Sequence, residues 1–141
     1  MQETTKLNPI TKFDNIISLI KNYNPQIITE EPDYIEIKIV SPFDEELWIE
    51  ISTEFSIFFC DWHAHYFASV EEYDVFLSDL LGILESKKFT VSAYINDLCW
   101  GCLSETETPD EVELRERYGN DKVIKCSYWD KTKNIVFDVC S

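Results

Sequence analysis

Residues 34–40 read YIEIKIV and residues 47–52 read LWIEIS, and these two stretches decide the fold. In each, an aliphatic residue alternates with a polar or aromatic one. Successive side chains of a β-strand point to opposite faces, so the alternation predicts two strands with one buried and one wet face. The connection, residues 41–45, is short enough to predict an antiparallel hairpin. A third strand is expected to begin at Glu54.

Two helices are expected around these strands. The first follows Thr11, shows apolar residues at helical spacing, and ends before Pro25. The second begins with a capping box, in which the Ser69 hydroxyl accepts from the amide of Glu72 and that glutamate reaches back. An apolar stripe follows this box, so the second helix is expected to pack on a sheet.

The last third of the chain predicts a further set of strands. Residues 89–95 and 98–103 are expected to form a hairpin around the turn Asn96-Asp97, because both turn residues tolerate left-handed conformations. Residues 110–118 predict a short acidic helix. Residues 123–129 and 134–139 are typical of a terminal hairpin.

The expected fold is therefore a single α+β domain of residues 1–141. A mainly antiparallel sheet of about five to seven strands would be covered on one face by the two helices, because consecutive strands with short connections pair antiparallel. Residues 1–10 are expected to form a loose N-terminal arm.

The charge of the chain restricts its partners. It carries 27 Asp and Glu residues against 12 Lys and Arg, a formal net charge of -15, while 45% of its residues are hydrophobic. That balance is typical of a folded protein with an acidic surface. Such a surface repels nucleic acid and anionic membranes and attracts basic proteins, so we expect a basic protein partner and neither nucleic acid nor membrane.

Two features favour a cytoplasmic protein. The five cysteines are an odd number, and the first six residues are polar without an apolar signal region. No stretch approaches the roughly 18 apolar residues that a membrane span needs.

The acidic residues gather in residues 30–54 and 105–116. Such clusters either keep a protein soluble or dock a basic partner. Trp48 lies on the polar side of an acidic strand, where an aromatic residue can anchor a partner. The residues expected to bind the partner are Glu45, Glu46, Trp48, Glu50, Glu111 and Glu113.

A candidate metal site lies in residues 61–65, DWHAH, which contain both histidines of the chain. In an extended segment Asp61, His63 and His65 share one face, and carboxylate and imidazole ligands suit zinc or iron. Two explanations compete for this face. Either the three side chains converge at the end of the sheet, or a bulge near Phe58-Phe59 or a strand end near Asp61 puts the histidines in water.

The pair Cys99 and Cys102 has the spacing of a redox motif. Such a motif works at the start of a helix, whereas here it falls on an expected strand, where residues three apart diverge. Both cysteines are therefore expected to be structural thiols. The sequence also lacks the glycine-rich phosphate loops and the Gly-x-Ser-x-Gly motif of hydrolases, so no catalytic residue is predicted.

Residues 58–84 resemble a known type of small bacterial protein. An aromatic strand, then Trp62-His63-Ala64-His65-Tyr66-Phe67, then a capped helix with Phe76, Leu80, Ile83 and Leu84, is similar to small bacterial proteins, some of which resemble immunity proteins of polymorphic toxin systems. The resemblance covers about a fifth of the chain. It implies a small, acidic, cytosolic and non-catalytic protein that masks the active site of a toxin.

Two functions therefore compete at this stage. The first is a non-catalytic protein-binding module, an immunity-type inhibitor whose acidic surface binds a basic toxin. The second is a metal-binding protein or metal-dependent enzyme that uses Asp61, His63 and His65; without that site no cofactor is expected.

Overall fold

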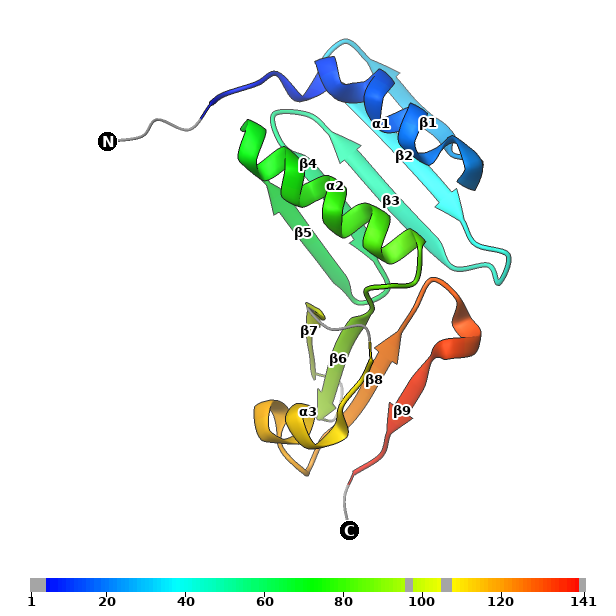
Figure 1. The fold of residues 1–141 in the computed structure, drawn as a ribbon, viewed down its shortest axis with the longest axis vertical. Helices are drawn as coiled ribbons and strands as arrows, with labels where there is room; N and C mark the ends of the chain where they lie inside the picture. Colours follow the sequence, from blue (N-terminus) through cyan, green and yellow to red (C-terminus); the bar gives the residue numbers. More distant parts are fainter. Residues whose placement is uncertain (1–4, 96–97, 105–107, 140–141) are drawn as a thin grey trace. The chain divides into compact units, whose positions relative to one another are not determined.

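The computed structural model of the chain describes residues 5–95, 98–104 and 108–139 (Figure 1). These residues divide into two compact units. The first unit comprises the chain up to residue 59 together with residues 63–81, and the second comprises residues 60–62 and the chain from residue 82 on.

The first unit contains a five-stranded sheet, and helical segments precede and follow these strands in the sequence. Its strands run in the order β1-β2-β3-β4-β5: β1 (Gln26–Glu31), β2 (Tyr34–Val40), β3 (Glu46–Ile51), β4 (Phe55–Phe59) and β5 (Trp62–Tyr66). Its helical segments are η1 (Pro9–Lys12), α1 (Phe13–Ile20), η2 (Lys21–Tyr23) and α2 (Val70–Leu84).

Helices α1 and α2 lie on one face of this sheet (Figure 1). The ring of Phe76 in α2 is 5.0 Å from that of Phe55 in β4 and 5.6 Å from that of Tyr66 in β5. Asn15 of α1 donates a hydrogen bond of 2.6 Å to the Tyr73 hydroxyl of α2, so α1 packs beside α2. The alternating aliphatic residues of β2 and β3 are buried beneath them. The alternation in residues 34–52 thus produced the expected buried face.

Two strands of this sheet were not expected from the sequence. β1 is an edge strand whose residues are nearly all exposed, and a register irregularity between Ile27 and Thr29 breaks its alternation. β5 exists because the chain reverses at Cys60, which adopts the left-handed conformation with φ 53°. A cysteine rarely adopts that conformation, so residue type gives no signal for the turn.

The second unit is a four-stranded sheet with one helix. The strands run in the order β7-β6-β8-β9: β6 (Thr90–Ile95), β7 (Leu98–Leu103), β8 (Val123–Ser127) and β9 (Ile135–Phe137). The helical segments are α3 (Glu111–Tyr118) and η3 (Lys131–Lys133). The buried cluster of this unit consists of Phe89, Val91, Leu114, Ile124, Cys126 and Tyr128.

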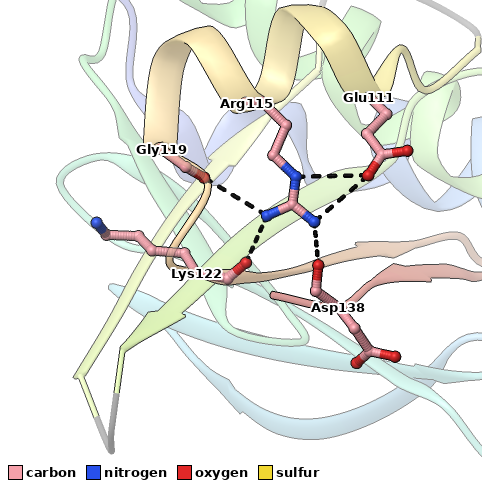
Figure 2. A network of polar contacts seen from close by, with 5 residues as sticks. All are labelled: Glu111, Arg115, Gly119, Lys122 and Asp138. Atoms are coloured by element: carbon pink, nitrogen blue, oxygen red, sulfur yellow. Dashed lines mark hydrogen bonds and ion pairs between the residues drawn. The ribbon is translucent and has the colours of Figure 1, made fainter. Parts of the chain in front are cut away.

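A polar clamp holds α3 (Figure 2). The Arg115 guanidinium donates to the carbonyl oxygens of Lys122, at 2.7 Å, and of Asp138. It also contacts the carbonyl of Gly119 and the carboxylate of Glu111. Asp110 caps the first turn of α3, because its side chain accepts a hydrogen bond from the amide of Glu113. One arginine thus ties the helix to the strands that follow it.

The structure confirms an α+β fold built from antiparallel pairs. The expected single sheet is instead two sheets, because the chain enters a new set of pairings after α2. The single domain of residues 1–141 stays a prediction.

The chain before the first helix is tied to the segment that leads into α2 by backbone hydrogen bonds. Residues 5–10, expected to be loose, are hydrogen-bonded: the Val70 amide donates to Thr5 and the Leu7 amide to Ala68. Residues 1–4, Asn96-Asp97, residues 105–107 and Cys140 lie outside the described residues. Within the described part of the chain, no helix is long and apolar enough to cross a membrane.

Candidate functional site

The outer face of the five-stranded sheet, opposite the helices, collects most of the side chains that could contact a partner. It is formed by alternate residues of four neighbouring strands, and we call it the outer face. Its residues are Tyr34, Glu36 and Lys38 of β2, Glu46, Trp48 and Glu50 of β3, Ser56 and Phe58 of β4, and His63 and His65 of β5.

An aromatic row crosses the middle of the outer face. Lys38 is paired with Trp48, and Trp48 is paired with Phe58, on three consecutive strands. The Lys38 ammonium lies 5.5 Å from the centre of the Trp48 ring. The Phe58 ring stacks on that of His63, with 5.7 Å between centroids. Trp48 and Phe58 are only partly buried, so aromatic surface on this row remains open to a partner.

A carboxylate row runs beside the aromatic row. Glu36 and Glu50 are cross-strand partners, and like charges in that position repel each other. The Tyr34 hydroxyl has one proton; it donates to Glu50 at 3.2 Å and lies 3.5 Å from Glu36, while the Thr29 hydroxyl donates to Glu36 at 3.3 Å. Burial, followed by the charge of Glu50, raises the pKa of Tyr34 to about 12, so this hydroxyl keeps its proton at neutral pH.

Hydroxyl donors alone therefore satisfy this pair of carboxylates. Among the described residues, no lysine or arginine forms an ion pair with Glu36 or Glu50, whereas Glu46 is paired with Lys38 at 3.6 Å. The two charges are thus available to a cation from another molecule.

The histidines occupy the end of the outer face. Nδ1 of His65 lies 2.8 Å from the Ser56 hydroxyl and 3.0 Å from a carboxylate oxygen of Glu54. A serine–histidine–acid relay needs the two partners on different ring nitrogens, and here both contact the same one. The His63 ring stands edge-on to that of His65, with 5.3 Å between centroids. This arrangement fixes the His65 ring and gives no activated nucleophile.

The expected metal ligands have separate surroundings. His63 and His65 share one face of β5, as their spacing predicts, and that face is exposed. Asp61 belongs to the turn before β5, where its carboxylate accepts a hydrogen bond from the Tyr94 hydroxyl. Among the described residues, no group of three His, Cys, Asp or Glu side chains could hold a metal ion. Of the two explanations for this segment, the strand end near Asp61 fits the structure.

The expected partner-binding residues fall into two sets. Glu46, Trp48 and Glu50 project from one side of β3, and Glu45 immediately precedes that strand. The others, Glu111 and Glu113, lie on α3 in the second unit. Glu111 is occupied by the Arg115 guanidinium at 3.4 Å (Figure 2), so its charge is already compensated within the chain.

Parity predicted Glu36 and Lys38 on the wet face of their strand. The sequence did not identify them, or Phe58, as partner-binding residues. The pairing register, which brings Trp48 between Lys38 and Phe58, is a tertiary property.

The cysteine motif of β7 is described only in part. Nothing is described for the side chain of Cys99, while Cys102 is half-buried and contacts Tyr118 of α3. Gly101 is one of the two residues between them. A Cβ at this position would lie 3.1 Å from the carbonyl oxygen of Asp61, which accounts for the glycine.

Comparison of the chain with protein-family models, with curated proteins and with solved structures gave no match.

Proposed function

We propose that this chain is a non-catalytic protein-binding module, and that the outer face is the surface on which a basic protein docks. The observation that carries the proposal is the Glu36–Glu50 pair, which adjoins the aromatic row and has no described cation of its own. The net charge of -15 supports the same assignment. A basic partner would be steered to the surface by long-range attraction.

The cost of the carboxylate pair argues for a binding role. Like charges opposite each other on neighbouring strands destabilise a sheet by roughly 0.2–1 kcal/mol. A cation from a partner would remove that repulsion, so the unfavourable term in the free protein becomes a favourable term in the complex.

The shape of the site favours arginine over lysine. A guanidinium is planar, donates in a fork that matches carboxylates, and stacks on aromatic rings. The outer face offers both features side by side: the carboxylates of Glu36 and Glu50, and the adjoining ring of Trp48. We therefore assign the partner's contacting residue as an arginine.

The biological role that we propose is inhibition of a basic toxin such as a nuclease. The resemblance of residues 58–84 to immunity proteins supports it, and so does the acidic face, which presents a row of carboxylates as nucleic acid presents phosphates. Glu45 and Glu46 extend the acidic surface at the start of β3. Charge reversal at Glu45, Glu46 and Glu50 should slow association with such a partner.

The first test uses peptide probes of equal charge, hexa-arginine and hexa-lysine. Binding is followed by the indole signal of Trp48 in NMR spectra, which a Trp48→Phe variant assigns. We expect hexa-arginine to bind more tightly than hexa-lysine, and Glu50→Gln to weaken hexa-arginine binding by roughly five- to tenfold, the effect of losing one charge-assisted contact.

Asp74→Asn is the matched control, because it makes the same charge change on the exposed side of α2. Equal losses for Glu50→Gln and Asp74→Asn would show that only net charge matters and would contradict the site. The same Glu50→Gln protein should be more stable in urea by roughly 0.2–1 kcal/mol, because the cross-strand repulsion is gone.

A further inference from the structure

A cluster of reactive groups in the second unit lies outside the proposed docking surface. Cys102, on the edge strand β7, is half-buried, and its sulfur lies 2.9 Å from the Tyr118 hydroxyl. The Arg117 guanidinium points at the same sulfur from 3.8 Å. Both residues come from the last turn of α3. A thiol is thus held between a cation and a hydroxyl.

A small cavity opens beside this thiol. Its volume is about 50 Å³, and Cys102, Arg117 and the apolar residues Phe89, Val91 and Leu114 contribute to its wall. That volume exceeds the roughly 10–15 Å³ that one water molecule needs, so a molecule the size of hydrogen peroxide fits. The carboxyl-bearing residues Asp110 and Glu113 also line it, and their charges oppose a thiolate. Arg117 is the cation in contact with the sulfur that counters them.

The hydroxyl in contact with the sulfur stays protonated. Burial, followed by the hydrogen bond to Cys102, raises the pKa of Tyr118 to about 12. That hydroxyl therefore keeps its proton at neutral pH and can donate a hydrogen bond to the Cys102 sulfur. At the buried neighbour Cys126, burial raises the pKa of the thiol to about 11.

We propose that Cys102 is a site of reversible oxidation by a hydroperoxide, with a cysteine sulfenic acid as the product. The thiolate sulfur attacks one peroxide oxygen, the S–O bond forms, and the O–O bond breaks. Hydroxide leaves and takes up a proton to become water. The sulfur gives up two electrons and the peroxide is reduced, so one thiol and one hydrogen peroxide yield one sulfenic acid and one water.

The fold keeps the product from closing a disulfide with Cys126. Cys102 and Cys126 are both partners of Val91, on the two strands that flank β6. Two strand spacings put their Cα atoms about 9–10 Å apart, beyond the roughly 7 Å that a disulfide can span. Cys126 therefore cannot resolve a sulfenic acid at Cys102, and reduction back to the thiol needs a different thiol, such as an external one.

The test exposes the reduced, full-length protein to hydrogen peroxide and traps sulfenic acid with dimedone. Peptide mass spectrometry then gives a separate rate for each cysteine. We expect Cys102 to be labelled faster than Cys60, although Cys60 is the more exposed thiol, and far faster than Cys126. Labelling of Cys102 no faster than Cys60 would show that exposure alone sets the rate and would overturn the proposal.

Two variants separate the contact between Arg117 and the sulfur from the effect of net charge. Arg117→Gln should lower the rate at Cys102 by roughly fivefold, because the thiolate loses a charged donor. Lys133→Gln makes the same charge change in η3 and should leave the rate unchanged. Equal effects of the two variants would refute the role of Arg117. In urea, where the contacts are gone, the advantage of Cys102 over the other cysteines must vanish.

Discussion

Different kinds of interaction stabilise the two units of this protein. The first unit covers its sheet with two helices, and its buried residues are almost all aliphatic or aromatic, with Phe76 in contact with three other rings. The second unit buries a smaller cluster and fixes its one short helix by the polar contacts of Arg115 (Figure 2). The free energy gained by burying apolar surface is proportional to the area buried. A small unit therefore depends more on individual polar contacts.

Of the changes that test this contrast, Phe76→Ala is expected to have the largest effect on stability. Phe76 is fully buried, and its loss should destabilise the first unit by about 3–5 kcal/mol. Urea unfolding followed by ¹⁹F NMR of fluorotryptophan reports on each unit separately, through Trp48 in the first and Trp129 in the second. If both probes lose the same stability, the chain unfolds as the single domain predicted from its sequence. Loss at Trp48 alone would show two independent units.

A smaller effect is expected for Arg115→Ala. The Arg115 side chain is 9% exposed, and without its guanidinium the carbonyls of Lys122 and Asp138 lose this donor. We expect a loss of about 2 kcal/mol at the Trp129 probe, as for hydrogen bonds to a charged group. Arg115→Lys keeps the charge but cannot reach several carbonyls at once, so it should recover little. Full recovery with lysine would contradict the clamp.

The smallest expected effect is a loss of folding stability at alkaline pH. The pKa of Cys126 is raised by burial from 9.0 to about 11, so above pH 9 the unfolded chain loses this proton first and stability falls until about pH 11. In the first unit, burial and then Asp79 raise the pKa of Tyr66, whose ordinary value is 10.0, so its contribution falls only above pH 10.

Urea unfolding between pH 7 and 11, in reductant, measures this difference. We expect the Trp129 probe to lose up to about 2 kcal/mol and to begin losing it one pH unit below the Trp48 probe. Cys126→Ala should remove the early loss. A common onset in the wild type, or an early loss that survives Cys126→Ala, would contradict the assignment.

Local patterns predicted much of the fold because they depend on neighbours in sequence. The alternation in residues 34–52, the Ser69 cap of α2 and the Asp110 cap of α3 all appear in the structure. The turn at Cys60 was missed because its left-handed backbone is imposed by the pairing of β4 and β5 within the sheet, and no glycine or asparagine marks it.

For the candidate site, the sequence determined which residues of β3 face outward, since parity fixes Glu46, Trp48 and Glu50 on one side. It also determined the acidic charge that a partner would meet. Only the tertiary structure decided their neighbours: the register set Glu36 opposite Glu50 and Phe58 beside Trp48. The folding of α3 brought Arg117 and Tyr118 to Cys102. The physical reason is that parity is a property of one strand, whereas register and helix docking depend on packing between segments distant in the chain.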